Sequence, residues 1–224
     1  MKIRVWDLPL RLFHWVLVLL LIVSFVTQYV GGNAMDWHFR AGYAVLVLVA
    51  FRLIWGFVGP RYARFSSFIY GPSTILGYLR SRQGKQYLGH NPLGSLSVFA
   101  LLGVVLAQAV TGMFANDDIV NEGPLVRFIS KDLSDQLTWI HKDVTAWLLL
   151  TLVGLHLLAL VWYAVVRKRN LVMPMISGDQ EVGAAEVAPQ PAQDSWKQRL
   201  LALAILTLLS AAMVWLVNLR PTYL

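Results

Sequence analysis

Four of the five histidines in this sequence lie in or beside long apolar stretches, at His14, His38, His141 and His156. An ionisable side chain within a membrane-like segment is rare and favours a functional role. Neutral imidazole binds transition metals, and a haem iron takes two such ligands, one on each face. The histidines therefore suggest metal or haem ligation. The alternative for any one of them is a hydrogen bond to a neighbouring helix.

The composition is that of a membrane protein. The chain has 224 residues, of which 57% are hydrophobic and 14% are charged, against about 45–50% and about 25% in soluble domains. It contains no cysteine, which excludes disulfides, thiolate-bound metals and covalently attached c-type haem. The net charge of +7 is typical of the basic loops of a membrane protein, so we expect no nucleic-acid partner.

Five apolar stretches are long enough to cross a bilayer, which takes about 20 residues. They cover residues 12–30, 39–58, 94–114, 140–166 and 200–219. The first run is too long for a cleavable signal peptide and has no small-residue cleavage site, so we expect it to be retained as a span. The segment 65–86 is amphipathic after Pro72, which predicts a short helix at the membrane surface.

The distribution of charge predicts the orientation in the membrane. Basic residues precede the first span, fill the loop between spans two and three, and close span four. The loop between spans three and four is mainly acidic. The positive-inside rule then places the N-terminus in the cytoplasm and, after five spans, the C-terminus on the outer side of the membrane.

A polar stretch rich in Pro, Ala and Gln divides the chain into parts. We expect a four-helix transmembrane domain at residues 1–177, a flexible cytoplasmic linker at 178–197, and a C-terminal transmembrane helix and tail at 198–224. The last span contains no histidine. It could be an inert anchor, or its small residues could allow close approach of a partner helix or a homodimer.

With this orientation the four histidines form two pairs of equal depth. His14 and His156 lie toward the cytoplasm, and His38 and His141 lie at the outer side. His141 and His156 are fifteen positions apart, which gives about 60° of rotation and about 22 Å of rise, so both can face one bundle interior. Zinc usually takes more ligands. Two b-type haems in a four-helix bundle, each held by two histidines, fit the count and the depths.

Two arginines and the fifth histidine have weaker assignments. Arg52 lies near the cytoplasmic end of span two and Arg40 lies beside His38, so each could bind haem propionates. For Arg52 the alternative is that the side chain extends to the membrane interface. His90 has no partner at its depth and is not assigned as a ligand. We expect it to cap a turn into the third span, with a role toward protons or quinone as the alternative.

Several short stretches form an ordered set over about residues 5–178. They are VWDLPLRLFHW, WHFRAGY, FRLIWGFVGPRYARF, YLGHNPLG, LAQAVTGMF and NLVMPMISG. Together with the two histidines of span four, they resemble the prokaryotic cytochrome b561 family, which includes the cytochrome b subunit of nickel–iron hydrogenase. The resemblance implies a four-helix core with two b haems at His14, His38, His141 and His156. It also implies quinone or soluble redox partners in the bacterial inner membrane, in which the C-terminus would be periplasmic. The fifth helix lies outside the minimal four-helix form.

The expected fold is therefore an all-α integral membrane protein, with a four-helix bundle holding two haems and a fifth C-terminal helix. The expected function is transmembrane electron transfer in a respiratory chain, between the quinone pool and a periplasmic redox protein such as a c-type cytochrome. The first alternative is the membrane subunit of a hydrogenase or other dehydrogenase complex. Others are a quinone oxidoreductase enzyme and, from another class, a haem-free metal-binding or transport protein.

Overall fold

The computed structural model describes residues 1–80, 87–181 and 190–219, and five long helices dominate it. They are α1 (Leu8–Val30), α2 (Met35–Val58), α4 (Pro92–Gly112), α6 (Ala146–Val165) and α8 (Trp196–Val217). Each is long and apolar enough to cross a membrane. The five predicted spans are confirmed, and the chain is a multi-pass membrane protein.

Shorter elements connect these helices. The helical ones are α3 (Pro72–Arg80), α5 (Lys131–Trp139), α7 (Val172–Ser177), the 3-10 turns η1 (Gly32–Ala34), η2 (Arg61–Ala63), η3 (Phe65–Ser67) and η4 (Val126–Phe128), and the π-helix η5 (Ile140–Thr145). Strands β1 (Lys2–Arg4) and β2 (Asp179–Glu181) pair antiparallel, with Ile3 opposite Gln180. The helix predicted after Pro72 is present as α3, and residues 81–86 of the predicted amphipathic segment lie outside the described residues.

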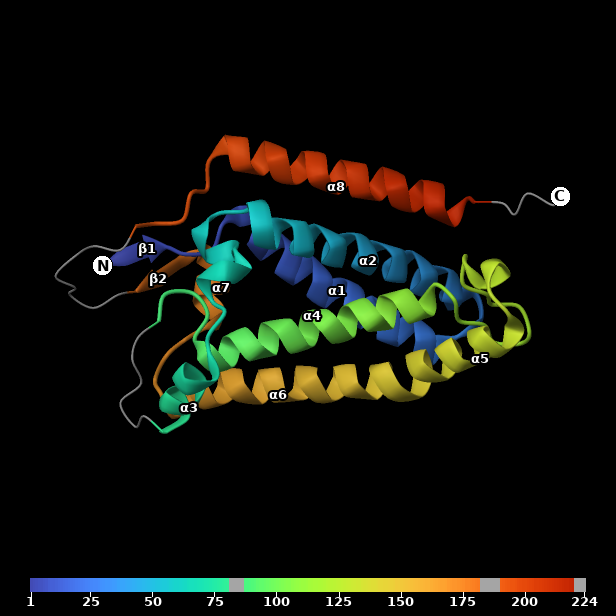
Figure 1. Ribbon diagram of the computed structural model, residues 1–224, viewed down its shortest axis with the longest axis horizontal. Coiled ribbons are helices and arrows are strands. Elements are labelled where there is room, and N and C mark those ends of the chain that lie inside the picture. Colours follow the sequence, from blue (N-terminus) through green and yellow to red (C-terminus); the bar gives the residue numbers. More distant parts are fainter. Residues whose placement is uncertain (81–86, 182–189, 220–224) are drawn as a thin grey trace.

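The helices run up and down, and sequence neighbours pack side by side. Helix α1 packs against α2, α2 against α4, and α4 against α6. Helix α8 lies along the far side of α2, away from α6 (Figure 1). Strands β1 and β2, α3 and α7 gather at one end, which we call the basic end because residues 2–11, 61–80 and 167–169 lie there. The other end, with the loop 113–130, is the acidic end.

Two helices begin with the same capping arrangement, which explains why they start before the apolar stretches do. The Asp7 carboxylate accepts a hydrogen bond from the Leu10 amide at 3.0 Å, and the Asn91 side chain accepts one from the Gly94 amide at 2.8 Å. A proline follows in the first turn of each helix. The residue that caps α4 is therefore Asn91, and the capping role expected for His90 is wrong.

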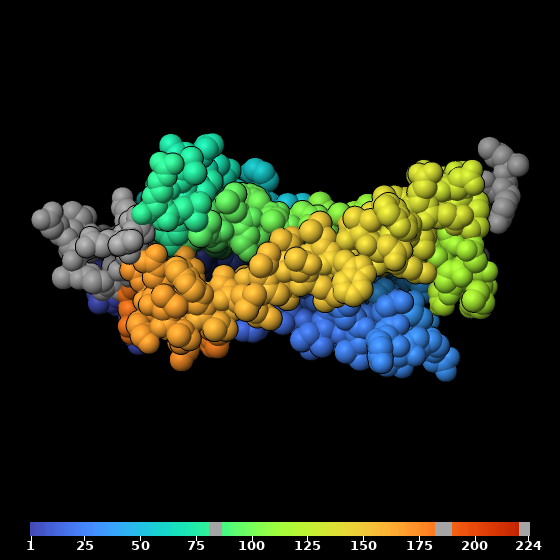
Figure 2. Space-filling view, turned by 90° about the horizontal axis from the view of Figure 1, so that it is seen from below, coloured from blue at the N-terminus to red at the C-terminus, as the bar shows by residue number. Residues whose placement is uncertain are grey.

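Helix α5, the π-helix η5 and helix α6 form one continuous helical run from Lys131 to Val165. Figure 2 shows this run, in yellow to orange, extending along the molecule from the acidic end to α3 at the basic end. Its first part is polar, so the run is longer than the apolar span predicted from the sequence. The π-helix falls where the run enters the apolar region.

The start of α8 is tied to the N-terminus. Arg4 forms ion pairs with Asp179 at 2.6 Å and Asp194 at 3.0 Å, and its carbonyl oxygen accepts a hydrogen bond from the Ala192 amide at 2.7 Å. The Tyr62 hydroxyl donates to the Gln190 carbonyl oxygen at 2.9 Å. Residues 182–189 of the expected linker lie outside the described residues, but its described ends are bound to the bundle rather than free.

The best-packed core lies at the basic end. Aromatic side chains from α2 and the following turns are fully buried there, including Phe51, Trp55 and Phe68. A smaller core of Val45, Val49, Val105 and Leu149 lies midway along the bundle. Most other apolar side chains of the long helices are exposed, as expected for surfaces that face lipid tails.

Candidate functional site

His38 and His141 come together at the acidic end of the bundle. His38 projects from α2 and His141 from the π-helix, and their ring centres are 6.2 Å apart with the planes at 86°. Both line a cavity of about 540 Å³, the acidic-end cavity. Two imidazoles that share one metal ion through bonds of about 2 Å place their ring centres roughly 6 Å apart. The spacing of the rings therefore suits a shared metal.

Backbone carbonyl groups orient both rings. The Nδ1 atom of His38 lies 2.9 Å from the Ser24 carbonyl oxygen, and the Nδ1 atom of His141 lies 2.9 Å from the Gln108 carbonyl oxygen. Because a carbonyl oxygen only accepts, each Nδ1 carries the proton and donates it. Each Nε2 atom then keeps its lone pair, which is the arrangement found in metal-binding histidines. At His141 this lone pair faces the Gln108 side-chain amide, with 3.3 Å between the two nitrogen atoms.

The π-helix and α4 together fix the position of His141. The Thr145 hydroxyl donates to the Ile140 carbonyl oxygen at 3.1 Å, across the π turn, and it also bonds the Gln108 side chain. Single π turns within α-helices are frequent at functional sites. On α4, a β-carbon added to Gly112 would lie 2.8 Å from Cε1 of His141. A glycine is therefore required at this position for His141 to occupy its place.

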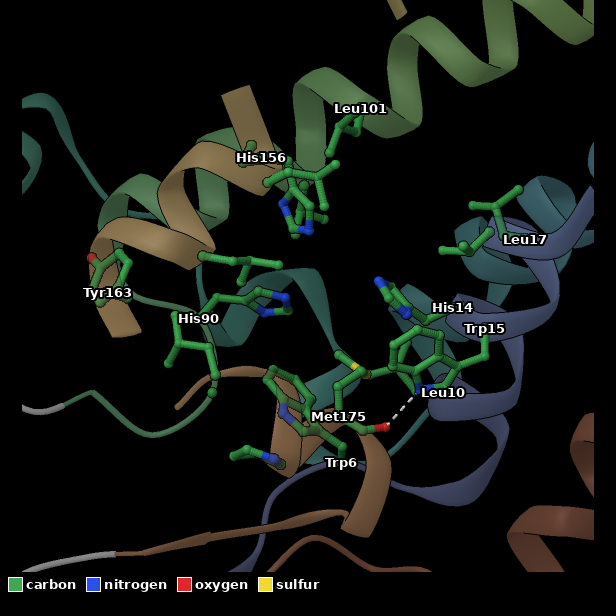
Figure 3. A pocket seen from close by; sticks show the side chains of 18 of the residues that line it. Trp6, Leu10, His14, Trp15, Leu17, His90, Leu101, His156, Tyr163 and Met175 are labelled. Carbon is green, nitrogen blue, oxygen red and sulfur yellow. Dashed lines mark hydrogen bonds between the residues drawn. The ribbon is translucent and has the colours of Figure 1, made fainter. Parts of the chain in front are cut away.

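His14 and His156 face the same cavity at the basic end. They point into one cavity from opposite sides, His14 from α1 and His156 from α6, as Figure 3 shows. The basic-end cavity has a volume of about 1260 Å³, and its middle part is lined by apolar side chains such as Leu17 and Leu101. The buried Nδ1 atom of His14 has no hydrogen-bond partner among the described residues.

Arg52 also lines the basic-end cavity and is 2% exposed. Its guanidinium lies 4.6 Å from the centre of the Phe65 ring. Within the described part of the chain, neither terminal nitrogen of this group has a hydrogen-bond partner. The buried Asp7 carboxylate interacts with this cation electrostatically, but burying terminal nitrogens without hydrogen-bond partners still costs several kcal/mol. The position therefore suits a further anionic partner, such as a carboxylate of a bound molecule.

Arg40 lies in a different environment from Arg52. Its side chain is exposed and lies 5.2 Å from the centre of the Trp37 ring. Among the described residues that line the acidic-end cavity, the basic residue is Lys142 rather than Arg40. The assignment of Arg40 to a propionate stays a prediction.

These features fit haem. Each cavity receives two imidazoles from different helices, and the volumes reach or exceed the range of about 300–1,000 Å³ typical of ligand pockets. The walls are largely apolar, and the unpaired guanidinium of Arg52 would suit a propionate. The four histidines would be the residues that hold the group. Their role as axial ligands stays a prediction.

Several residues of the two sites were not identified from the sequence. They are Ser24, Gln108, Thr111, Gly112 and Lys142 around the acidic-end cavity. Gln108 and Thr111 could have been identified from the sequence, because polar side chains within an apolar span usually face the bundle interior. Ser24 acts through its backbone carbonyl group, and Gly112 acts by allowing His141 to approach α4 closely. Neither role can be recognised from the sequence alone.

Comparison with known proteins gives the family. A family model described as prokaryotic cytochrome b561 matches residues 5–178. The chain belongs to this family. Proteins named probable Ni/Fe-hydrogenase B-type cytochrome subunits are similar to it. The one from Bradyrhizobium diazoefficiens is 27% identical over 80% of this chain and 86% of its own length, and the one from Azotobacter vinelandii is 29% identical over 79% and 87%. The one from Escherichia coli K12 is 29% identical over 48% and 57%. No solved structure matches the chain significantly.

Family membership confirms the general class predicted from the histidines. The protein is a b-type cytochrome of the cytochrome b561 family, a membrane protein that binds haem b and transfers electrons across the membrane. The matched region ends at Gly178, just before β2. Helix α8, which packs on α2, lies outside the matched region.

Proposed function

We propose that the protein carries electrons across the bacterial inner membrane through two haem b groups, each bound by two histidines. His38 and His141 would hold the haem at the acidic end, and His14 and His156 the haem at the basic end. The observation that supports this most directly is the pair His38 and His141. Their rings are 6.2 Å apart, and both Nδ1 atoms donate to backbone carbonyl groups, so that each Nε2 atom keeps the lone pair that a ligand needs.

Bound haem b would supply reversible one-electron exchange, and binding by two histidines would favour electron transfer over oxygen chemistry. The protein chain would provide the environment of the haem. The apolar lining excludes water, the carbonyl groups of Ser24 and Gln108 orient the imidazoles, and the Arg52 guanidinium provides a buried positive charge. Helix α6 and the π-helix carry one ligand of each pair, fifteen residues apart.

The orientation follows from the charge distribution. The basic end would face the cytoplasm and the acidic end the periplasm, by the positive-inside rule. Electrons would then pass between the quinone pool of the membrane and a redox protein at the acidic end. The N-terminus would be cytoplasmic, and α8 would end on the periplasmic side.

A second candidate makes this chain the cytochrome b subunit of a hydrogenase complex, in which the periplasmic partner is a hydrogenase. The names of the similar proteins favour it. The test is purification of the tagged chain from its host in mild detergent, followed by mass spectrometry. Hydrogenase subunits recovered with the chain, and haem reduction by H₂ in that preparation, would support it. Recovery of a different dehydrogenase or of the chain alone would favour a general carrier.

Counting the haems tests the main proposal. A pyridine haemochrome assay on the purified protein should give two haem b per chain. His38→Ala and His156→Ala should each lose one haem and keep the other, whereas Arg40→Gln, at an exposed position, should keep both. One haem in the unaltered protein would reduce the proposal to a single pair. Two haems in either histidine variant would show that the pairing is wrong.

A further inference from the structure

Asp7 is a buried carboxylate close to the basic-end cavity, and one of its two oxygen atoms makes no hydrogen bond. The Oδ1 atom accepts hydrogen bonds from the Leu10 amide at 3.0 Å and from the Trp55 indole N–H at 3.1 Å. The Oδ2 atom is buried as well, and it has no partner among the residues that the structure describes. Capping α1 requires one side-chain oxygen, so the cap does not explain the second, unbonded oxygen in the interior.

Asp7 and His14 lie on one face of α1. They are seven positions apart, which corresponds to about 20° of rotation and about 10 Å of rise along a helix. Trp6 and Leu10, on either side of Asp7 in the sequence, line the basic-end cavity together with Arg52. Asp7 itself is fully buried. The carboxylate therefore lies in the wall of the cavity, on the basic-end side of the histidine that would bind the haem.

Two charged groups face this carboxylate from other elements. Arg52 of α2 attracts it, and neither terminal nitrogen of the guanidinium has a hydrogen-bond partner in the described part of the chain. Asp194, from the segment before α8, repels it. The charge of Asp194 is itself compensated by ion pairs with Arg4 at 3.0 Å and Arg199 at 3.1 Å. Burial raises the pKa of Asp7, and the hydrogen bonds to Oδ1 offset only part of this rise.

The other titratable groups nearby are poor proton acceptors. His90 approaches the guanidinium of α2 from the loop before α4. Its ring is held between Trp6 and Phe68, with ring centres 4.7 Å and 4.4 Å away. Burial lowers the pKa of His90 to about 3, so this imidazole stays neutral. The Arg11 guanidinium, on α1, donates to a carbonyl oxygen of α7, and arginine keeps its proton in proteins. Asp7 is thus the group of this set whose charge can change.

Reduction of a haem in this cavity would act on Asp7, because it adds one negative charge. At a distance of about 10 Å and an effective dielectric constant of about 20, a unit charge alters the proton affinity of a carboxylate by about tenfold. Water can deliver the proton. The basic-end cavity is also lined by Lys2 and Glu181, whose side chains are largely exposed, so the cavity reaches the aqueous surface at this end.

We propose that Asp7 takes up a proton when the basic-end haem is reduced and releases it when the haem is oxidised. The inference rests on the proposed function, which supplies the haem and its electron donor. One electron passes from the reduced donor to the haem, one proton passes from water at the basic end to Oδ2, and an O–H bond forms there. Oxidation returns both. Electron transfer at this end of the bundle is thereby coupled to proton uptake, while Arg52 stays charged.

The test is a redox titration of the purified, haem-loaded full-length protein at a series of pH values, followed by optical spectroscopy. His38→Ala, expected to keep only the basic-end haem, assigns the potential of that haem. In the unaltered protein this potential should fall as the pH rises, by about 59 mV in total for a tenfold difference in proton affinity. In Asp7→Asn, which keeps a side-chain acceptor for the cap, it should not change with pH. Asp132→Asn, in the exposed first turn of α5, is the matched control and should retain the fall.

Infrared difference spectra give a second readout, which detects the proton itself. On reduction, the unaltered protein should gain a C=O band of a protonated carboxyl group, and this band should shift in D₂O. It should be absent from Asp7→Asn and from Asp7→Ser, in which serine can also cap the helix. Arg52→Met removes the attracting cation, so the fall of the potential should move to higher pH.

The haem content measured on the same samples separates the possible failures. Two haems per chain with a pH-independent potential would overturn this inference and leave the proposed function intact. An unchanged pH dependence in Asp7→Asn would also overturn it, and would assign the proton to another group, such as a haem propionate. Fewer than two haems in the unaltered protein would instead contradict the proposed function. Should Asp7→Asn not accumulate, Asp7→Ser and the infrared spectra of the unaltered protein carry the same comparison.

Discussion

Gly112 and His141 touch across the interface between α4 and the π-helix. The distance from a β-carbon at position 112 to Cε1 of the imidazole would be 2.8 Å, and to Nδ1 it would be 3.2 Å. The backbone of α4 and the ring therefore share a contact that admits no side chain. The adjacent Gln108 carbonyl oxygen accepts the hydrogen bond that sets the direction of the ring.

Gly112→Ala should therefore displace His141 and remove one haem while the other remains. The cause is steric, since nothing polar is lost. The measurement is the haem count per chain with a reduced-minus-oxidised spectrum. Gly103→Ala is the matched control on the same helix, because a β-carbon there meets no described atom within 4 Å. Full retention of both haems by Gly112→Ala would show that His141 does not need its present position.

Arg52→Met should lower the reduction potential of one haem, because a buried positive charge favours the reduced, less positive state of the iron. The shift is expected to be on the order of tens of millivolts, since charge interactions in partly buried sites are only partly screened. Arg52→Lys keeps the charge and should shift the potential less. Redox titration followed by optical spectroscopy measures both variants.

Arg40→Gln tests the corresponding prediction for the other haem. Its side chain is exposed, so solvent and salt screen its charge. We expect a shift smaller than that of Arg52→Met. An equal or larger shift in the same titration would support the direct role for Arg40 that the sequence suggested.

Asp7→Ala should destabilise the protein by about 2–4 kcal/mol, from the loss of a helix cap and of a buried hydrogen-bond acceptor. The carboxylate caps α1 and accepts the Trp55 indole N–H at 3.1 Å, and both side chains are fully buried. Asp7→Asn keeps a side-chain acceptor and should cost less. Thermal unfolding in detergent, followed by loss of the haem absorption, measures the difference. Asp36→Ala, in the exposed first turn of α2, serves as the control.

Arg4→Gln should increase proteolytic cleavage between β2 and α8 by several-fold, because it removes two ion pairs that hold the ends of this segment. Lys2→Gln is a suitable control. Its contact with Glu181 is 4.0 Å long and both side chains are largely exposed, so it should contribute little. Equal cleavage of the two variants would mean that the backbone bonds alone hold the segment.

Much of the fold could be predicted because a bilayer permits few backbone structures. A backbone in lipid must satisfy its own hydrogen bonds, so apolar stretches of sufficient length become helices. Their number, order and approximate limits followed from hydropathy, and α3 followed from the amphipathic pattern after Pro72. The depth of each histidine followed from the same reasoning, and the structure brings His38 close to His141 as expected.

What the sequence could not supply depends on contacts between distant segments. The π-helix at His141 arises from packing against α4 and from the Thr145 hydroxyl, and hydropathy does not register a turn with one extra residue. The buried position of His90 between Trp6 and Phe68 needs three segments to converge. Arg40 and Arg52 looked alike as basic residues near histidines, but only the fold shows that one is exposed and the other buried.

The π-helix also allows the two ends of the bundle to change independently, because it contains His141 but not His156. Deleting one residue from Ile140–Thr145 would restore α-helical geometry and change the direction of the side chains within this turn, His141 among them, while α6 and His156 stayed where they are. A single insertion or deletion here thus acts as a local register shift. Evolution could retune or abolish the site at the acidic end in one step without disturbing the other.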